Sequence, residues 1–433
     1  MSKESNKVKD LCEFIWHLED KYKLFDIKIK DIYIWEYIRM QVYYKLAATA
    51  GVLEPPGKRV SILDRIKIFF NGFIYTLTNN LFTLKESNLI FFSHPRSVSV
   101  DNEYIDIYSE YLIREKQTKQ SIVDFEADYQ GKHIRKRKHK VHRLDWVKQL
   151  VYFRYFFVIK NSILKQKEVD LFQTIENEIY KQYGIKYALA NLVESKLKLF
   201  SIYYSIYTRV FKKVKPKSIY IVVAYYYAPI IKAAKDLGIE TIELQHGIIT
   251  KYHLGYSFPN IKKPLHYFPD KIMVWDQSWK KNIDYPITSE NILIDSFRYL
   301  EQIKKQYETL PKIKNTYLVL SQTAISENIA KKILDNLDFF KGKKIVYKLH
   351  PAEFDIWKNN QSLTQLQKVL DIEIVASQKH LYHLMATSEF QVGVFSTALY
   401  EGVVFNCKTI LLNIQGIEYM EDFIKVNETI ILK

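Results

Sequence analysis

Short apolar runs alternate with amphipathic stretches over the second half of the chain. Runs rich in β-branched residues predict strands at 219–223, 239–244, 316–320, 345–349, 372–375, 390–395 and 408–412. Between them apolar residues recur at helical spacing, and the helix predicted at 228–237 ends at Gly238. A strand, a helix and a further strand within ~25 residues form a parallel crossover unit. The pattern therefore predicts an α/β protein with two Rossmann-like domains that face each other across a cleft.

The beginning of the chain is predicted to be helical, because apolar residues recur every three or four positions in 11–22 and 31–46. The aromatic stretch 150–211 is also expected to be mostly helical. We expect an N-terminal helical region, an N-terminal Rossmann-like domain and a C-terminal one, at 1–86, 87–300 and 301–433. A strand at 89–92 is expected to open the first of these domains, and the hinge is expected within 297–315.

The helix predicted at 58–85 has two interpretations. Its apolar positions follow helical spacing, and basic residues flank them: Lys58, Arg59, Arg65, Lys67 and Lys85. A basic amphipathic helix with aromatic residues lies in the interface of a membrane. A helix with the same spacing also fits against a protein core. Both interpretations stay open at the level of sequence.

Composition narrows the class of protein. The chain has 433 residues, of which 48% are hydrophobic, so it is long enough for two or three folded domains. Its two cysteines, Cys12 and Cys407, lie too far apart to indicate a disulfide framework or a zinc cluster. The first residues lack the apolar core of a signal peptide, and no stretch reaches the ~18 apolar residues of a membrane span. We expect a cytoplasmic protein, either free or peripheral at the inner face of the plasma membrane.

The formal charge of +16 is concentrated in part in one segment. Seven basic residues and no acidic one fall within 132–143: Lys132, Arg135, Lys136, Arg137, Lys138, Lys140 and Arg143. Such a run is either a solvated loop or a site of attraction to anionic lipid or to a polyanionic acceptor. The sequence has no helix-turn-helix, zinc or RNA-recognition motif, so nucleic acid is not expected as a partner. A basic nucleic-acid-binding protein on a nucleotide-binding scaffold is the alternative from a different class.

Gln245, His246 and Gly247 directly follow the strand predicted at 239–244. Polar residues past the carboxyl end of such a strand lie where open α/β sheets bind ligands. An imidazole is suited to take a proton at neutral pH, so His246 is the candidate general base. Alternation along the strand puts Glu243 on the opposite side from His246, which makes it a poorer candidate. The competing interpretation is a loop histidine that only holds its own turn.

Three further strand ends carry polar residues: Ser321-Gln322, His350-Pro351 and Ser396-Thr397. The last pair opens a helix, where hydroxyls and backbone amides together bind anions. His350 is suited to stabilise phosphate charge, and Glu401, one turn along the helix, to bond a ribose hydroxyl. Ser321 and Gln322 are expected to line the same pocket. Each feature also has a structural interpretation, as a turn, a helix N-cap or a favourable charge near the start of a helix.

Several common nucleotide and hydrolase motifs are missing from the sequence. It has no Gly-x-Gly-x-x-Gly, no Gly-x4-Gly-Lys-Ser/Thr, no Gly-x-Ser-x-Gly and no Asp-x-Asp pair. His380 and His383 have helical spacing but no third ligand nearby in the sequence, so we do not expect a metal site there. The chain is therefore expected to need no metal and no cofactor.

The ordered set Gln245-His246-Gly247, His350-Pro351 and Ser396-Thr397 with Glu401 resembles bacterial GT-B glycosyltransferases of capsule and O-antigen lipopolysaccharide synthesis. It is similar in pattern to CMP-sugar transferases (sialyl-, polysialyl- and Kdo-transferases) and to CDP-glycerol glycerophosphotransferases. The resemblance covers roughly 215–433, and the segment 392–402 looks like the nucleotide-binding strand and helix of these families. Many sialyltransferases carry an acidic motif where this chain has Gln245-His246-Gly247, which is closer to the teichoic-acid enzymes.

The resemblance implies that the first Rossmann-like domain binds the acceptor and the second binds the donor. His246 would deprotonate the acceptor, while Ser321, Gln322, His350, Ser396, Thr397 and Glu401 would hold the nucleotide. The implied reaction is metal-independent, inverting transfer of a CMP-activated nonulosonic acid or Kdo to a glycan or glycolipid of the cell surface. A CDP-polyol phosphotransferase and a transferase using a UDP-, GDP- or dTDP-sugar are the alternatives.

Overall fold

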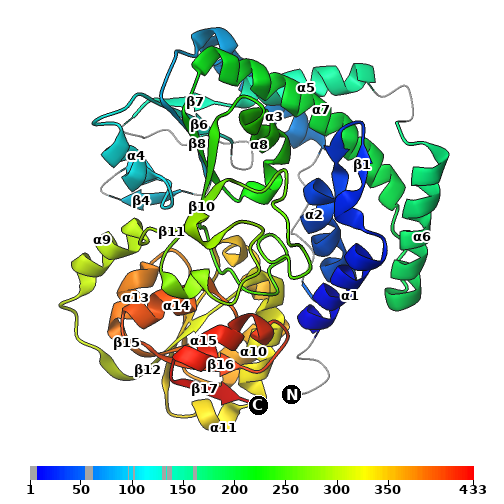
Figure 1. Cartoon of the computed structure of the whole chain (residues 1–433). Coiled ribbons are helices and arrows are strands. Elements are labelled where there is room, and N and C mark those ends of the chain that lie inside the picture. Colours follow the sequence, from blue (N-terminus) through cyan, green and yellow to red (C-terminus); the bar gives the residue numbers. More distant parts are fainter. Residues whose placement is uncertain are drawn as a thin grey trace.

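Two parallel sheets, one above the other in Figure 1, organise the chain. The computed structural model describes residues 7–53, 62–95, 97–100, 103–128, 133, 139–158 and 163–433. Five of the seven basic residues noted in 132–143 lie outside the described residues: Lys132, Arg135, Lys136, Arg137 and Lys138. Of the other two, Lys140 is exposed and Arg143 lies over the ring of Tyr75.

The N-terminal sheet has seven parallel strands. They are β3 (Leu89–Ser93), β6 (Ile122–Glu126), β7 (Val141–Arg143), β8 (Ser218–Val222), β9 (Glu240–Leu244), β10 (Lys271–Val274) and β11 (Ile292–Ile294). Their order in space is β11-β10-β9-β8-β3-β6-β7, so the chain runs outward from β3 to one edge and then from β8 to the other. This reversal between β3 and β8 defines a doubly wound Rossmann-like sheet, with its ligand site at the carboxyl ends of the strands.

The C-terminal sheet repeats the same topology with six parallel strands. They are β12 (Ile313–Leu320), β13 (Lys344–Lys348), β14 (Ile372–Val375), β15 (Ser388–Gly393), β16 (Lys408–Leu412) and β17 (Thr429–Leu432), in the order β14-β13-β12-β15-β16-β17. All seven strands predicted from apolar runs are present. The last of these predicted strands, 408–412, does not end the sheet, because β17, which was not predicted, pairs with β16 beyond it. As a half-exposed edge strand, β17 lacks the long buried run that marks the others.

Helices fill the connections between the strands. The described ones are α1 (Lys7–Lys21), α2 (Ile34–Thr49), α3 (Ile62–Thr78), α4 (Glu110–Lys116), α5 (Asp145–Val158), α6 (Gln166–Tyr183), α7 (Leu189–Val214), α8 (Ala228–Lys235), α9 (Arg298–Tyr307), α10 (Ser326–Leu334), α11 (Leu337–Phe340), α12 (Gln361–Val369), α13 (Leu381–Thr387), α14 (Thr397–Val404) and α15 (Glu421–Val426). The stretch in which we expected the hinge contains α9. Two antiparallel pairs add β1 (Lys28–Ile29) with β2 (Ile32–Tyr33), and β4 (Val98–Val100) with β5 (Glu103–Ile105). None of the described helices combines the length and the hydropathy that crossing a bilayer requires.

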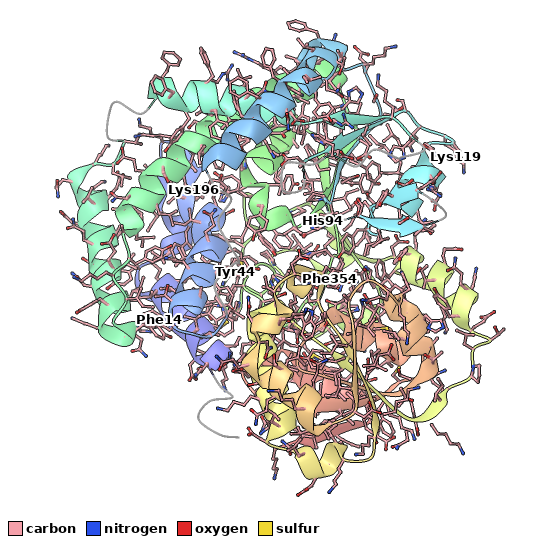
Figure 2. All side chains as sticks on the ribbon, turned by 180° about the vertical axis from the view of Figure 1, so that it is seen from behind. Phe14, Tyr44, His94, Lys119, Lys196 and Phe354 are labelled. Atoms are coloured by element: carbon pink, nitrogen blue, oxygen red, sulfur yellow. The ribbon has the colours of Figure 1, made fainter. Side chains whose placement is uncertain are left out.

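The N-terminal helices are built into the rest of the molecule. Figure 2 shows Phe14, Tyr44 and Lys196 on α1, α2 and α7, which pack side by side. Apolar residues of α1 and α2 share one hydrophobic cluster with residues of α6, of α7 and of the segment 249–292. The boundaries drawn at 86 and 300 stay predictions, but the core of the N-terminal half includes residues on both sides of the first one.

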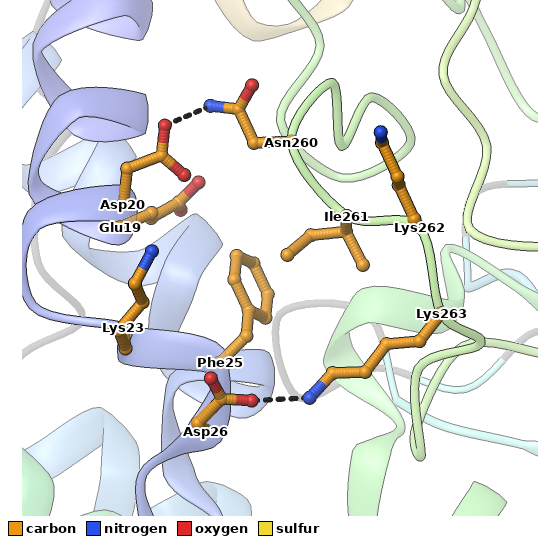
Figure 3. Close-up of a pocket in the computed structure, with 9 residues that line it drawn as sticks. All are labelled: Glu19, Asp20, Lys23, Phe25, Asp26, Asn260, Ile261, Lys262 and Lys263. Atoms are coloured by element: carbon orange, nitrogen blue, oxygen red, sulfur yellow. Dashed lines mark hydrogen bonds and ion pairs between the residues drawn. The ribbon is translucent and has the colours of Figure 1, made fainter.

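Polar contacts connect the N-terminal helical region to both halves of the chain. Figure 3 shows a pocket of about 310 Å³ between α1 and the segment 260–263, where Asn260 bonds Asp20 at 2.6 Å and Lys263 pairs with Asp26. At the other end of α1, the backbone N–H of Val8 donates to Glu418 Oε1 of the C-terminal half at 3.2 Å. The helices α1 and α2 therefore lie along the junction of the two domains.

Candidate functional site

The segment after β9 turns sharply, and Gln245 holds that turn. Its side chain is buried; the amide Nε2 donates to the carbonyl of Gly247 at 2.9 Å, and Oε1 accepts the backbone N–H of Trp275 at 2.8 Å. Gln245 is thus occupied by the scaffold. The next residue, His246, is half-buried among three tyrosine rings, Tyr108, Tyr225 and Tyr256.

His246 is linked to Glu243 through the hydroxyl of Tyr256. This hydroxyl donates to Glu243 Oε1 at 2.6 Å and lies 3.2 Å from His246 Nδ1. Because the single hydroxyl proton points to the carboxylate, Nδ1 carries its own proton toward the tyrosine oxygen, and the lone pair of the neutral imidazole is on Nε2. The expectation that Glu243 faces away from His246 was wrong. The turn after Leu244 brings the imidazole back to the side of Glu243, so strand alternation no longer applies there.

Burial sets the charge of both end groups. It lowers the pKa of His246 to about 3, with a smaller effect of the neighbouring His253 and His94. It raises the pKa of Glu243 to about 7, even though the bonds from Tyr256 and from the Ala224 N–H favour the carboxylate. Val223 adopts a left-handed backbone with φ +65°, a conformation that β-branched residues rarely adopt, and so aims that N–H at Glu243.

A buried arginine on α2 fixes the segment that carries Tyr256. Arg39 Nη1 donates to the carbonyls of Leu254 and Ser257, the latter at 2.9 Å. Its Nε and Nη2 bind Glu19 of α1 at 2.6 and 2.9 Å, and both partners are buried. A bidentate pair in this geometry holds the guanidinium in one orientation. Through Arg39, the N-terminal helices determine where the tyrosine hydroxyl lies.

In the C-terminal domain, His350 caps the short helix 351–353 that follows β13. Its Nδ1 accepts the backbone N–H of Ala352 at 3.2 Å and lies 2.9 Å from Thr323 Oγ1. A nitrogen that accepts a backbone N–H carries no proton, so the neutral ring is protonated on Nε2 and donates from there. The buried Glu353 supports the turn, because Oε2 accepts the His350 N–H at 2.7 Å and Oε1 accepts the Ser321 hydroxyl at 2.9 Å.

Ser321 is therefore bound to Glu353 inside the domain, whereas Gln322 bridges two strand ends. Gln322 Oε1 accepts the N–H of Phe395 at 3.2 Å and so joins the ends of β12 and β15, between which the strand order reverses. Ser396 accepts the N–H of Ala398 at 3.2 Å and is the N-cap of α14. The side chain of Ser396 therefore acts as a helix cap, as the structural interpretation expected. The first backbone amides of α14 lie at the carboxyl end of β15.

The two halves of the candidate site meet at Gly247 and Thr397. A Cβ atom added to Gly247 would lie 3.3 Å from Thr397 Oγ1, which is closer than ordinary van der Waals contact, so the two segments approach each other closely here. Gly247 follows β9 and Thr397 follows β15, so the carboxyl ends of the two sheets are turned toward each other. The loop of His246 and the start of α14 thus lie next to each other.

Glu401 lies one turn further along α14 and is buried. It lines a cavity of about 470 Å³ between the domains, together with Trp275 and Phe297, whose rings stack at 4.5 Å. Neither His246 nor His350 is among the described residues that line this cavity. Glu401 therefore faces a part of the junction where an aromatic surface is available, one turn along α14 from Thr397.

The described part of the chain has no group of three or more His, Cys, Asp and Glu side chains placed to hold a metal ion. His380 and His383 pack instead against the ring of Tyr307, at 6.3 and 5.8 Å between ring centres.

Five residues of the site were not predicted from sequence: Arg39, Glu243 as a partner of the histidine, Tyr256, Thr323 and Glu353. Only Glu353 has a local signal, because proline and glutamate one and three positions after His350 form the pattern of a capping box.

No protein-family model and no curated protein matches the chain. Among solved structures, it is similar to the UDP-GlcNAc 2-epimerase of Methanocaldococcus jannaschii, with 11% identity, 79% of this chain and 88% of that chain covered, and a TM-score of 0.45. It is similar to the UDP-GlcNAc 2-epimerase of Neisseria meningitidis, with 13% identity, 75% and 81% covered, and a TM-score of 0.40. It is also similar to the glycotransferase of kitacinnamycin, with 10% identity, 80% and 86% covered, and a TM-score of 0.43.

The fold assignment rests on the sheets themselves. Both have the doubly wound strand order, and their carboxyl ends meet at Gly247 and Thr397. This is the GT-B arrangement. The predicted fold class, two Rossmann-like domains with an N-terminal helical extension, is confirmed.

Proposed function

We propose that the protein is a nucleotide-sugar glycosyltransferase in which His246 takes the proton of the acceptor hydroxyl. The observation that carries this proposal is the bonded series Glu243, Tyr256 and His246, next to the start of α14. It gives His246 a defined tautomer with the lone pair on Nε2, which is what a general base requires. A histidine that only held its turn would need no buried carboxylate behind it.

The pKa values determine where the proton goes. As the acceptor oxygen forms its bond to the sugar, its proton passes to His246 Nε2. The Nδ1 proton passes to Tyr256, and the tyrosine proton passes to Glu243. An imidazolium with a pKa of about 3 would hold the proton poorly, whereas the Glu243 carboxyl has a pKa of about 7 and holds it at neutral pH. The base strength of the site is therefore that of Glu243.

On the donor side, the proposed phosphate site combines three donors at the carboxyl ends of the C-terminal strands. They are the Nε2–H of His350, the hydroxyl of Thr397 and the first backbone amides of α14. Donors at a helix start favour negative charge, and this charge grows on the nucleotide as the bond to the sugar breaks. Gln322 is proposed to hold the strand ends in register, and Ser321 to support His350 through Glu353. Glu401 is proposed to bond the ribose from within the aromatic cavity.

The proposed donor is a CMP-activated acidic sugar, a nonulosonic acid or Kdo, and the proposed acceptor is a glycan or glycolipid of a bacterial surface polysaccharide. The order of the His-Pro and Ser-Thr pairs in the sequence supports this choice. Transfer is proposed to be inverting and to need no metal. A CDP-polyol phosphotransferase and a transferase of UDP-, GDP- or dTDP-sugars use the same parts of such a site, so they are tested alongside.

The test begins with melting curves in the presence of CMP, CDP, UDP, GDP and dTDP, since a ligand that binds the native state raises the melting temperature. The sugar donors of the best nucleotide are then assayed for transfer, with EDTA present. We expect CMP to give the largest shift, His246→Ala to abolish turnover without changing the shift, and the exposed His17→Ala to behave as wild type. Unchanged turnover in His246→Ala, or no shift with any nucleotide, would overturn the proposal.

A further inference from the structure

Two neighbouring helices of the N-terminal domain carry apolar side chains on their outer faces. On α3 these side chains follow helical spacing: Phe69, Phe70, Phe73, Ile74 and Leu77. On α5 they do so again: Tyr152, Phe153, Phe156 and Phe157. We call these nine residues the aromatic face. The two helices pack against each other, and Phe69 contacts Tyr152 at 6.1 Å between ring centres, so the face is continuous.

The aromatic face is exposed to an extent that is rare for large apolar residues. Phe70 is 66% exposed, Phe156 74% and Leu77 68%. An aromatic side chain has ~200 Å² of surface, so the rings alone present roughly 800 Å². The largest apolar patch of a typical monomer is about 300–600 Å², and larger ones mark sites of association. The helices lie at the end of the N-terminal domain that is remote from the C-terminal domain, and their side chains project outward there (Figures 1 and 2).

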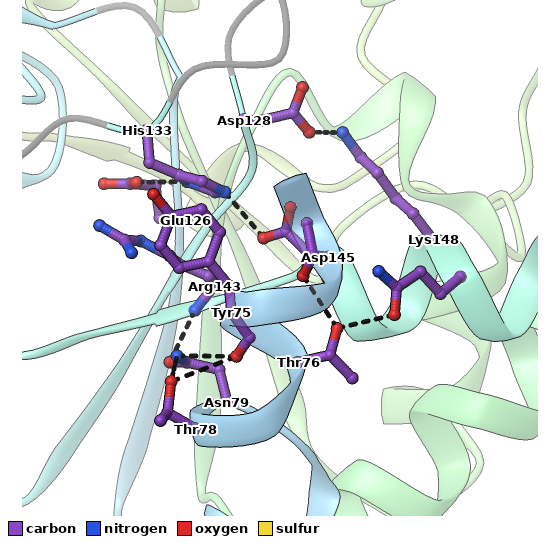
Figure 4. A network of polar contacts seen from close by, with 12 residues as sticks. Tyr75, Thr76, Thr78, Asn79, Glu126, Asp128, His133, Arg143, Asp145 and Lys148 are labelled. Carbon is purple, nitrogen blue, oxygen red and sulfur yellow. Dashed lines mark hydrogen bonds and ion pairs between the residues drawn. The ribbon is translucent and has the colours of Figure 1, made fainter. Parts of the chain in front are cut away.

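The opposite side of α3 is polar and is fixed to the domain. Figure 4 shows this inner side, where Thr76 bonds Gln149 at 2.8 Å and Asn79 accepts the N–H of Arg143 at 3.2 Å. His133 bridges Glu126 and Asp145 at 2.8 and 2.7 Å just below the helix. A helix that packs on a core has its apolar side inward, and α3 has the reverse. Rotation of α3 to bury its phenylalanines would break these contacts, so the aromatic face is not a core face.

Beyond Asp64 and Asp145 in their first turns, the charged residues of these two helices are basic. The segments 65–85 and 146–167 contain no aspartate or glutamate, while they contain Lys67, Lys85 and Arg154 among other basic residues. The helix α7 packs along α5 and presents exposed Arg209, Lys212 and Lys213 in its last turns. Two copies of such a surface repel each other, whereas an anionic surface attracts it.

We propose that the aromatic face docks the protein on a bilayer that contains anionic lipid. Its rings enter the boundary between head groups and acyl chains, and the arginines and lysines beside it contact the phosphates of the head groups. An interfacial anchor typically has aromatic residues on one side of its helices and basic residues around them, as this surface does. In the docked protein, the candidate site at the junction of the two domains lies on the side of the N-terminal domain away from the membrane. The anchor does not depend on which sugar is transferred.

The test is sedimentation of the full chain with sucrose-loaded vesicles. Vesicles of phosphatidylcholine alone are compared with vesicles that include phosphatidylglycerol. One variant replaces Phe153, Phe156 and Phe157 by serine, and a second carries Arg209→Glu, Lys212→Glu and Lys213→Glu. The matched control replaces three exposed apolar residues of the C-terminal domain by serine: Ile356, Val369 and Ile430.

We expect wild type and the control to sediment with the anionic vesicles, and the serine variant to partition at least tenfold less. The glutamate variant is expected to bind the anionic vesicles more weakly than wild type. Its binding is also expected to lose the dependence on salt concentration that wild type shows. Transfer to a water-soluble acceptor is expected to be the same in all four proteins. Absence of sedimentation with anionic vesicles, or equal sedimentation of the serine variant, would overturn the proposal. So would a wild-type dimer that the serine variant converts to a monomer, because the face would then be an interface between copies.

Discussion

The substitution Glu243→Gln separates the proposed role of the carboxylate from its place in the fold. Glutamine has nearly the same shape, and its Oε1 still accepts from the Ala224 N–H and from the Tyr256 hydroxyl. It cannot accept the proton that His246 releases through Tyr256. In the variant, this proton must stay on an imidazole whose pKa is about 3, instead of moving to a carboxyl whose pKa is about 7.

The size of the effect follows from the two pKa values. A difference of about four corresponds to ~5 kcal/mol between the two proton positions. If roughly half of it is expressed in the transition state, the barrier rises by ~3 kcal/mol and kcat falls about 100-fold. In wild type, kcat/KM is expected to rise with pH through about 7, because only ionised Glu243 accepts the proton. This rise is expected to disappear in the variant.

The same substitution, Glu243→Gln, is expected to raise the stability of the protein although it lowers its activity. The pKa of Glu243 is 4.5 in an ordinary environment and about 7 in the folded protein, so the folded state binds this proton more tightly. The free energy of unfolding of wild type therefore falls as the pH rises through this range and has lost about 3 kcal/mol above it. Glu243→Gln removes this loss and is expected to melt several degrees higher than wild type at pH ~8.

The assay is a pH series of initial rates with saturating donor, combined with melting curves at two pH values. Tyr256→Phe is expected to slow the reaction to a similar extent, and the double variant is not expected to be slower than either single one, because both break one path. Glu240→Gln is the matched control: Glu240 lies on the same strand but pairs with Lys271 near the surface. An unchanged pH profile in Glu243→Gln, or additive losses in the double variant, would refute the reasoning.

Three further changes test the site and its supports. His350→Ala removes a donor to the phosphate and should weaken nucleotide binding 10- to 100-fold in titration calorimetry; unchanged affinity would exclude the role. Arg39→Met leaves Glu19 buried without its partner and should cost ~3–5 kcal/mol in urea unfolding; a cost below ~1 kcal/mol would contradict a clamp. Gly402→Ala places a Cβ 1.9 Å from Gln391 Oε1 and should destabilise the protein by ~1–3 kcal/mol; wild-type melting would show that the two side chains adapt.

The fold was largely predictable because buried parallel strands leave continuous β-branched runs in the sequence. The run Ile219-Tyr220-Ile221-Val222 and its counterparts were identified to within a few residues. The strands β6, β7, β10, β11 and β17 were not, because each is short and contains or adjoins charged residues. The predicted helix at 58–85 was left open between core and membrane. Only the polar contacts beneath α3 distinguish the two sides of that helix.

The site was predictable only where the strand-end rule applies. This rule identified His246, His350 and Thr397 as candidates. In the structure, the loop of His246 approaches Thr397 at Gly247. The rule says nothing of groups that come from elsewhere. Tyr256 reaches His246 from ten residues further along a loop, and Arg39 reaches that loop from a different helix. No periodicity or spacing in the sequence records such contacts, since they depend on how separate elements pack.

The bond from Val8 to Glu418 spans 410 residues of sequence. During synthesis, α1 leaves the ribosome well before its partner, which is made 410 residues later. The contact between α1 and Glu418 can therefore form only after most of the second sheet has been made. Contacts this distant slow folding and leave apolar surface open in the meantime, so the nascent chain is expected to be a prolonged client of cellular chaperones.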